Sequence, residues 1–327
     1  MSVLVTGGAG YIGSHATLAL LDAGYDVVVI DNLSTGVREA VPASVPLVIG
    51  DVGDGDLTAK IMREHKVDAI MHFAGSIIVP ESVSDPLKYY LNNTANSRTL
   101  IQSAVKNNVG TFIFSSTAAV YGMPEIIPVT EDAPTVPINP YGTSKLMTEW
   151  MLRDTTAAHD LVAGVLRYFN VAGADPQGRV GQSTPRATHL IKVACQTAIG
   201  AREKVQIFGD DYPTEDGTGI RDYIHVCDLV DAHVELLKYL TSKRQSVTMN
   251  CGYGRGYSVR QVLDTVQRVS GDKLNIETAS RRAGDPPIIV ADASRIGETL
   301  GWRPKHDDLD FIVRTALDWE KRLHRIA

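Results

Sequence analysis

The stretch Gly7-Gly8-Ala9-Gly10-Tyr11-Ile12-Gly13 decides the fold. It follows a short apolar run, Val3-Leu4-Val5, and leads into an apolar-striped helical pattern at 11–23. Gly7, Gly10 and Gly13 at such a place permit a tight turn, let a pyrophosphate approach the backbone, and allow close packing of the helix. The helix N-terminus then faces the phosphates. The stretch therefore predicts a strand–turn–helix unit that binds a dinucleotide.

Beyond this unit, short apolar runs alternate with helical patterns. Continuous apolar runs are typical of strands that are covered on both faces. We expect further strands at 27–30, 47–49, 69–73, 111–114 and 163–166. The helical patterns between them lie at 55–65, 87–107 and 141–158. This order predicts an α/β protein with a Rossmann-type, doubly wound parallel sheet.

After about residue 170 the alternation loosens. Loop signals at 174–178 and 210–217 accompany helical patterns at 187–200, 227–241, 258–270 and 307–323. We expect an NAD-binding Rossmann domain at 1–170 and a smaller α/β lobe at 171–327 that closes over the cofactor. Some segments of the second half are expected to return to the first domain.

Acidic residues follow the second and third expected strands. Asp31 ends the second strand, where a carboxylate accepts hydrogen bonds from the adenosine ribose and repels a 2′-phosphate. NAD is therefore favoured over NADP. Asp51 and Val52 are expected to end the third strand, on the adenine side. Asp51 could equally be a helix N-cap.

Tyr141 and Lys145 are four residues apart in Asn139-Pro140-Tyr141-Gly142-Thr143-Ser144-Lys145, so they share one face of a helix. A free tyrosine has a pKa of about 10, which a nearby cation lowers. Such a tyrosine can act as a general base near neutral pH. Beside a nicotinamide, this pair favours oxidation of an alcohol, with the hydride passing to NAD+. Alone, the pair would more often be an ordinary helix pair, but after an N-terminal phosphate-binding turn the catalytic interpretation is preferred.

Two further positions have alternative interpretations. His72, in His72-Phe73-Ala74-Gly75 at the end of the fourth strand, is interpreted as a packed or loop-bonding histidine and not as a catalyst. Asn92 lowers the helix propensity of its segment. It is either a plain surface asparagine or a cofactor contact.

Composition excludes several classes of function. The 327 residues are 44% hydrophobic and 21% charged, with a formal net charge of −6 and no basic run, which argues against a nucleic-acid partner. No signal peptide and no apolar stretch of about 18 residues is seen, so we expect no membrane association. Cys195, Cys227 and Cys251 are widely spaced, without the spacing of a metal site. They suit a reduced, cytoplasmic chain.

The motifs together resemble the extended short-chain dehydrogenase/reductase family and, within it, the UDP-glucose 4-epimerases. The resemblance runs almost from end to end. Besides the segments quoted above, it rests on 115–122, 167–170, 207–209 and, most specifically, 211–226. It implies NAD-dependent interconversion of UDP-glucose and UDP-galactose. The C4 alcohol is oxidised, the 4-keto sugar rotates, and the hydride returns to the opposite face.

The resemblance also implies the site residues. Tyr141 takes the sugar O4 proton, Lys145 binds the nicotinamide ribose and lowers the pKa of Tyr141, and Thr117 bonds O4. The NAD contacts it implies are Gly7, Gly10, Tyr11, Ile12, Gly13, Asp31, Asn32, Asp51, Val52, Phe73, Ala74, Asn92, Ser115, Tyr141, Lys145 and Tyr168. The UDP-sugar contacts are Thr117, Tyr141, Asn170, His189, Leu190, Phe208, Arg221, Tyr223, Arg282, Asp285 and Ile289. The segment 184–190 is aligned only through Thr188-His189-Leu190.

Two positions depart from the family pattern. Ile77 stands near the nicotinamide, where many members carry lysine. Ile289 stands at the gatekeeper position for N-acetylated sugars, where familiar members carry tyrosine, cysteine or serine. Epimerisation of UDP-GlcNAc/GalNAc or UDP-xylose/arabinose is therefore an alternative. A 4,6-dehydratase is disfavoured because Ala118 and Ala119 follow Thr117, and a silent NAD-sensing regulator because Tyr141 and Lys145 are both present.

The resemblance further implies a homodimer. The helices at 87–107 and 141–158 would form a four-helix bundle across a two-fold axis. The apolar surface expected for this bundle is Leu100, Ile101, Ala104, Leu146, Trp150 and Leu152. The alternative is that these residues only pack on the sheet.

Overall fold

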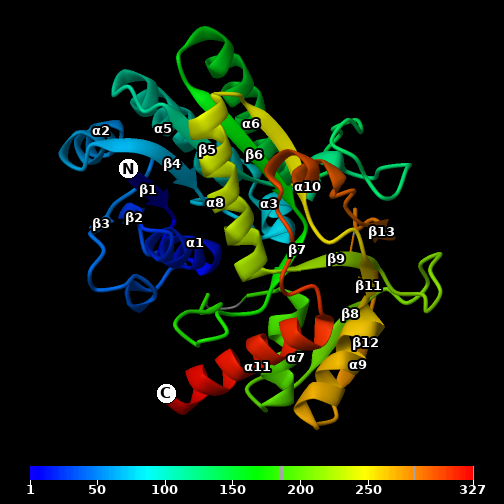
Figure 1. The fold of residues 1–327 in the computed structure, drawn as a ribbon. Helices are drawn as coiled ribbons and strands as arrows, with labels where there is room; N and C mark the ends of the chain where they lie inside the picture. Colours follow the sequence, from blue (N-terminus) through cyan, green and yellow to red (C-terminus); the bar gives the residue numbers. More distant parts are fainter. Residues whose placement is uncertain (185–186, 283, 327) are drawn as a thin grey trace.

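The computed structural model describes residues 1–184, 187–282 and 284–326. Its main layer is a seven-stranded sheet in the order β10-β6-β5-β4-β1-β2-β3, with every neighbouring pair parallel (Figure 1). The strands are β1 (Ser2–Thr6), β2 (Asp26–Asp31), β3 (Leu47–Ile49), β4 (Val67–His72), β5 (Thr111–Thr117), β6 (Val162–Tyr168) and β10 (Val247–Cys251). The predicted Rossmann-type α/β class is confirmed.

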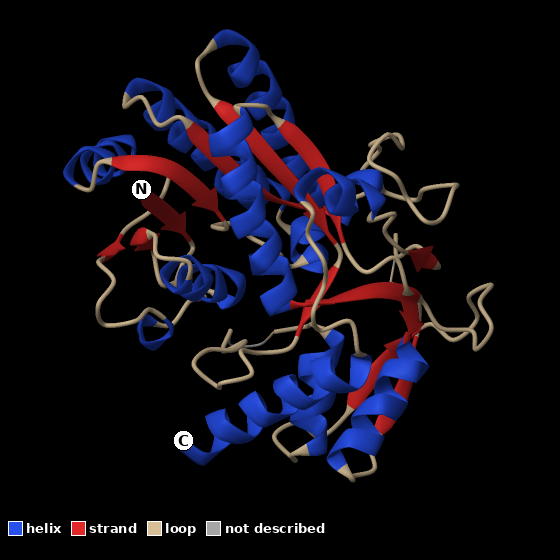
Figure 2. Ribbon diagram, viewed as in Figure 1, coloured by secondary structure: helices blue, strands red, loops and turns tan. Residues whose placement is uncertain are grey.

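Helices cover both faces of this sheet (Figure 2). One face carries α1 (Tyr11–Asp22), α8 (Val226–Lys243) and α10 (Ser294–Leu300), and the other carries α2 (Gly55–Glu64), α5 (Asn96–Lys106) and α6 (Pro140–Ala158). Alternation along β1 sends Val3 and Val5 into the first core and Leu4 into the second. The near-continuous apolar strands of the sequence follow from this double cover.

The segment expected as one helix at 87–107 has a more complex shape. It consists of α4 (Pro86–Tyr89), a π-helical turn at Tyr90–Ala95, and α5, and it is preceded by α3 (Val79–Ser84). Such π-turns are rare and occur often at functional sites. A pattern of apolar residues does not reveal one extra residue in a turn, so the interruption could not be predicted.

Two strand ends also differ from the expectation. β3 ends at Ile49, so Asp51 and Val52 follow the strand and do not end it, and β4 ends at His72. The expected end of the third strand at Asp51 and Val52 is therefore wrong. Asp51 instead accepts hydrogen bonds from the side chains of two other segments and from the backbone of its own, described below.

The second half of the chain contains two small sheets and a group of three helices. One sheet holds β7 (Asn170–Ala172), β9 (Ile220–His225), β11 (Gly256–Ser258) and β13 (Ile288–Ile289), and the other β8 (Val205–Phe208) and β12 (Ile276–Ala279). The helices are α7 (Leu190–Ala198), α9 (Val259–Ser270) and α11 (Leu309–Ile326), which share a core below the main sheet in Figure 1.

The segments that return are β10, which is a strand of the first sheet, and α8 and α10, which cover one of its faces. The division at residue 170 stays a prediction. Residues 185–186, within the segment 184–190, lie outside the described residues. Among the helices of the described ranges, none combines the length and the apolar character needed to cross a membrane.

Candidate active site

The glycine turn brings β1 against the segment that follows β4. Gly7 has a φ of +70°, and a Cβ atom there would lie 2.7 Å from the backbone nitrogen of Ala74. A Cβ atom at Gly13 would lie 2.1 Å from the Gly7 carbonyl oxygen. Only glycine fits both places. Gly10 is the N-cap of α1 and brings no side chain to the helix N-terminus. The turn is thus a cradle whose backbone fits a pyrophosphate.

Asp31 lies at the edge of this turn and is 7% exposed. Its Oδ2 accepts a hydrogen bond from the Ala9 nitrogen at 2.9 Å, and its Oδ1 accepts one from the Leu33 nitrogen at 2.8 Å. Both bonds hold the carboxylate at the carboxyl edge of β2, where the ribose of a dinucleotide binds in this fold.

Asp51 joins three segments near Asp31. Its Oδ2 accepts from Asn32 Nδ2 at 3.1 Å, and its Oδ1 accepts from the Gly53 nitrogen at 2.7 Å and from Asn96 Nδ2 at 2.9 Å. The N-cap of α2 is Asp54. The N-cap interpretation of Asp51 is therefore wrong. Val52 is buried in the core beneath it.

The loop after β4 is held by the π-turn. Asn92 Nδ2 donates to Ser76 Oγ at 2.8 Å, while Asn93 Oδ1 accepts from the Ser76 nitrogen at 2.7 Å. Asn92 is partly buried by this contact, so the interpretation as a plain surface asparagine is wrong. Its contact with the cofactor stays a prediction, as do those of Phe73 and Ala74 in the same loop.

His72 is a packed histidine, as expected. Its Nδ1 is 2.7 Å from Thr6 Oγ1 and its Nε2 is 2.8 Å from Ser97 Oγ. Burial lowers the pKa of the imidazole to about 3, so the ring is neutral at physiological pH. It joins β4, β1 and α5 below the site.

Tyr141 and Lys145 stand in the first turns of α6. Asn139 caps the helix by accepting from the Gly142 nitrogen at 2.9 Å, and Pro140 occupies its first position. Lys145 Nζ donates to the Ser115 carbonyl at 3.0 Å and lies 4.9 Å from the centre of the Phe114 ring. The helix start thus places both side chains at the carboxyl end of β5.

The pKa values of this pair differ from the expectation. Burial raises the pKa of Tyr141, and the hydrogen bond with the Thr117 side chain lowers it. Lys145 was expected to lower it, but its ammonium is directed to the Ser115 carbonyl, and Thr117 has the lowering effect instead. Burial lowers the pKa of Lys145 to about 8, against the charge of Glu149, which raises it.

Two other tyrosines surround the Tyr141 ring. Tyr89 meets it edge to face, with ring centres 6.4 Å apart, and its own hydroxyl donates to the Ile78 carbonyl at 2.7 Å. Tyr168 bonds through its hydroxyl to Ser115 Oγ. The sequence analysis missed Tyr89, and no spacing signal in the sequence connects it with Tyr141.

The segment that packs on the glycine turn meets Lys145 at Gly75. A Cβ atom on Gly75 would lie 3.5 Å from Lys145 Nζ and 3.0 Å from Asn93 Oδ1. Gly75 directly follows Ala74, the residue against which Gly7 packs. The glycine turn, the loop after β4 and α6 therefore form one continuous site.

Four residues of the expected UDP site line one small cavity. They are Asn170, His189, Leu190 and Tyr223. Asn170 and Tyr223 are paired across β7 and β9. His189 Nδ1 is 2.8 Å from Gln182 Nε2, and burial lowers its pKa to about 4. The imidazole is therefore neutral and acts as a hydrogen-bonding group, not as a charge.

The remaining residues gather beside β8, β9 and β13. The Arg282 guanidinium lies 3.8 Å above the centre of the Phe208 ring. Arg221 Nη1 donates to the Ile220 carbonyl at 2.9 Å, and Arg221 and Asp285 both act electrostatically on Tyr212. An arginine side chain has five N–H donors, so Arg221 and Arg282 have further donors that could bind an anion.

The two departures from the family pattern lie in different surroundings. Ile289 is buried, pairs with Arg221 across β13 and β9, and belongs to a cluster with Ala118 and Phe169. Ile77 is 47% exposed in the loop after β4 and contributes no charge there.

Comparison with known proteins defines the class. Residues 3–252 match the model of the NAD dependent epimerase/dehydratase family, and the chain belongs to that family. It is 64% identical over 323 residues to a UDP-glucose 4-epimerase from Azospirillum brasilense, across 99% of this chain and 93% of the relative.

Two solved structures match over nearly the whole length. A UDP-glucose-4-epimerase from Stenotrophomonas maltophila, with bound NAD and formylated UDP-arabinopyranose, is 39% identical with a TM-score of 0.96 and 100% coverage of both chains. A UDP-Glc/GlcNAc 4-epimerase from Campylobacter jejuni is 47% identical with a TM-score of 0.86, covering 98% of this chain and 99% of its own. The resemblance predicted from the motifs is confirmed.

Proposed function

We propose that this chain interconverts UDP-glucose and UDP-galactose by reversible NAD-dependent oxidation at C4, rotation of the 4-keto sugar and re-reduction on its opposite face. The observation that carries the proposal is the meeting of Tyr141, Thr117 and Lys145 with the glycine cradle at Gly75. The full-length similarity to UDP-glucose 4-epimerases supports it.

Each side chain has a role in this proposal. Tyr141 takes the O4 proton and later returns it, with the Thr117 hydroxyl bonded to both the phenol and O4. Lys145 binds the nicotinamide ribose, and Asp31 binds the adenosine ribose, which selects NAD. When bound, NAD+ accepts the C4 hydride and returns it, and its positive charge favours the ionised form of a nearby phenol.

The UDP part of the substrate provides most of the binding energy, because the sugar must be free to rotate. Arg221 and Arg282 present guanidinium forks, which suit phosphate oxygens. Asn170, His189, Leu190 and Tyr223 form the cavity wall beside them. Binding energy is then placed away from the reacting ring, so that the sugar can turn without release of the nucleotide.

A dehydratase has less support. Removal of water across C5 and C6 needs an extra acid and base, and Ala118 and Ala119, which follow Thr117, carry no ionisable group. Epimerisation of another UDP-sugar is the second candidate, because the wall at position 289 is a branched aliphatic side chain of intermediate size.

The test is incubation of the purified protein with UDP-galactose, UDP-GalNAc and UDP-arabinose, without added NAD, followed by separation of the products. We expect UDP-glucose from UDP-galactose as the main product, and none from a Tyr141→Phe control. Turnover of only the other two sugars would support the second candidate, and a 4-keto-6-deoxy product would contradict epimerisation.

We also propose a homodimer, formed by a surface that differs from the one expected. Leu100, Ile101, Ala104 and Leu152 are buried against the sheet, and Leu146 is buried in a cluster with Ala118 and Ile289. The assignment of these five residues to a dimer surface is therefore wrong. The large apolar side chains that are exposed on the same helices are Leu87, Leu91, Met147 and Trp150. Such a set on adjacent helices suits a four-helix bundle with a second copy.

The dimer is tested with Leu91→Asp, which places a charge in the bundle. Light scattering should change from a dimer to the monomer mass of 35.4 kDa. Ile126→Asp is the matched control, because Ile126 is equally apolar and exposed but lies in the loop 123–138. A wild-type monomer would contradict the dimer. We place the enzyme in the cytoplasm, where its three cysteines stay as thiols.

A further inference from the structure

A buried ion pair lies directly behind the catalytic helix. Glu149, one turn after Lys145 on α6, is 7% exposed, as is Arg167 of β6. Arg167 Nη2 donates to Glu149 Oε2 at 2.6 Å, and Arg167 Nε donates to Oε1 at 3.1 Å. A fork of this kind is the strong form of an ion pair. Nothing in the proposed chemistry so far uses it.

The carboxylate also contacts the strand that carries the catalytic groups. Ser116 Oγ donates to Glu149 Oε1. Ser116 stands between Ser115, whose carbonyl accepts from Lys145, and Thr117, whose hydroxyl bonds to Tyr141. Glu149 therefore holds the middle residue of a three-residue segment, and both neighbours of that residue touch the catalytic pair.

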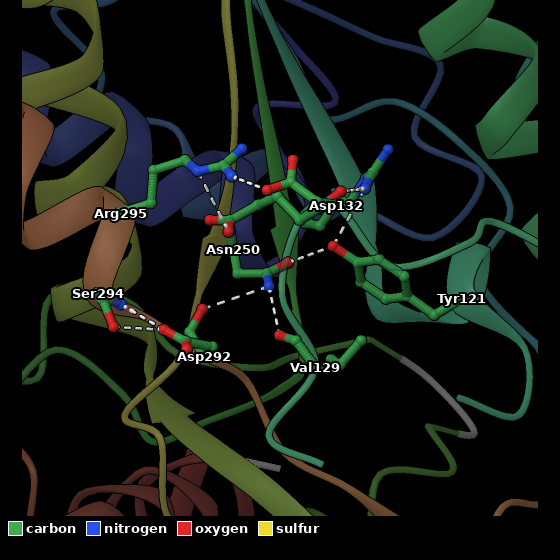
Figure 3. A network of polar contacts seen from close by, with 9 residues as sticks. Tyr121, Val129, Asp132, Asn250, Asp292, Ser294 and Arg295 are labelled. Atoms are coloured by element: carbon green, nitrogen blue, oxygen red, sulfur yellow. Dashed lines mark hydrogen bonds and ion pairs between the residues drawn. The ribbon is translucent and has the colours of Figure 1, made fainter. Parts of the chain in front are cut away.

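The ion pair is anchored on its other side by further polar contacts. Arg167 Nη1 donates to the Tyr121 hydroxyl at 3.0 Å, and this hydroxyl donates to Asn250 Oδ1 at 2.7 Å. Asn250 Nδ2 in turn donates to the carbonyls of Val129, at 2.8 Å, and Asp292, at 3.3 Å (Figure 3). This network reaches the segment just after Ile289. These contacts fix the position of Arg167, and Arg167 in turn fixes the carboxylate of Glu149.

Lys145 has few charged neighbours in its buried site. On α6 it is Glu149, and the titratable His72 on β4 is kept neutral by burial. The phenol of Tyr141, whose pKa is raised, is neutral as well. From β5 it meets the Phe114 ring and the Ser115 carbonyl, and Tyr168 of β6 stands behind Ser115. Glu149 is the charged group that acts on the lysine in favour of its protonated form.

We propose that Glu149 is a positioning residue of the reaction: its carboxylate orients Ser116 and supplies the negative charge that keeps Lys145 protonated. Spacing i, i+4, i+8 puts Tyr141, Lys145 and Glu149 on one face of α6. The proposal rests on the proposed function through Lys145. The protonation of Lys145 can be measured without any sugar. A failure of the role proposed for Glu149 is therefore distinguishable from a failure of the proposed epimerase function.

The first experiment compares wild type with Glu149→Gln, which keeps the shape and removes the charge. Lys145 is titrated by NMR of protein with carbon-13-labelled lysine, its signal identified by its loss in Lys145→Arg. We expect its transition to move to lower pH by about one unit, because a negative neighbour is lost. The alkaline limb of the kcat profile should move in the same direction, with kcat lowered about 10-fold or more.

A second variant separates the effect of the Glu149 charge on Lys145 from its effect on the stability of the fold. Glu149→Gln leaves Arg167 buried without its partner, which is strongly destabilising. The double variant Glu149→Met/Arg167→Met removes both charges and keeps apolar packing. The proposal expects the Lys145 transition to stay displaced in this variant. A return to wild-type titration and wild-type kcat would show that the pair only stabilises the fold, and would overturn the proposal.

The matched control is Glu320→Gln. Glu320 is 2% exposed and forms a second deeply buried glutamate pair, with Lys192, between α11 and α7. Its loss should lower the melting temperature as Glu149→Gln does, but should leave the Lys145 transition in place. The role of Glu149 would be refuted if the Lys145 titration moved equally in Glu320→Gln, or if it did not move in Glu149→Gln.

Discussion

The proposed cofactor side of the site, around Gly7 and Asp31, and the proposed nucleotide-sugar side, around Arg221 and Arg282, consist of different kinds of groups. The cofactor side consists of backbone and buried groups: Gly7 packs on Ala74, and Asp31 is fixed by two backbone donors. The sugar side relies on long side chains, with an exposed Arg282 stacked on Phe208 and Arg221 on a short strand. A rigid cradle suits a cofactor that is kept through the cycle. Adaptable side chains suit a ligand that must rotate and leave.

Tyr141→Phe acts where the two sides meet and should have the largest effect. The phenyl ring preserves packing but has no proton acceptor, so kcat should fall roughly 100-fold or more. UDP binding, measured by calorimetry, should stay unchanged because Arg221 and Arg282 are intact. Near wild-type turnover in this variant would rule out Tyr141 as the base.

Ile289 tests the sugar side, because we expect it to form part of the wall of the sugar pocket. A branched aliphatic group should admit a hydroxyl easily and an N-acetyl group poorly. Ile289→Ser should therefore raise the ratio of UDP-GlcNAc to UDP-glucose turnover, by roughly 10- to 200-fold per relieved misfit, and Ile289→Tyr should lower it. UDP-galactose turnover is the internal control. A ratio that is the same in both variants would remove Ile289 from the pocket.

Gly7→Ala tests whether the cofactor side is rigid. The left-handed backbone costs about 1–2 kcal/mol with a side chain, and the new Cβ atom would lie 2.7 Å from the Ala74 nitrogen. We expect at least about 10-fold weaker retention of NAD, measured as nucleotide released on denaturation. Gly24→Ala is the control, with a φ of +82° but no atom within 4 Å of the added Cβ. It carries the same backbone cost without the contact.

The same assay checks the choice of cofactor. Wild-type protein should release NAD, because Asp31 repels a 2′-phosphate. Release of NADP alone would contradict the role of Asp31.

Phe208→Ala should have the smallest effect, because the sugar side is adaptable. Loss of the ring below Arg282 removes an exposed cation–π contact of about 0.5–1 kcal/mol. KM for UDP-galactose should rise about 2- to 5-fold with kcat unchanged, since UDP is bound equally in ground and transition states. A fall in kcat of the same size would mean that Arg282 also acts on the transition state, and the contrast between the two sides would weaken.

Local signals were sufficient for the cofactor side. Glycines between a strand and a helix, and a carboxylate at the end of the next strand, are consequences of backbone geometry that any such turn requires. The i, i+4 spacing of Tyr141 and Lys145 likewise follows from the helix itself. The same spacing, continued by one turn, pointed to Glu149, which the sequence analysis did not use.

The sequence by itself thus determined the fold class, and it predicted the glycine turn and the Tyr141–Lys145 pair as parts of the site, because each depends on residues close together in the chain. Only the tertiary structure decided which apolar helix residues are buried and which face outward, since Leu100 and Met147 are both flexible apolar side chains, yet Leu100 is buried and Met147 is exposed. It also decided the protonation of the site. The pKa of Tyr141 depends on burial and on Thr117 at the end of β5, and no spacing in the chain indicates that this residue contacts Tyr141 on α6.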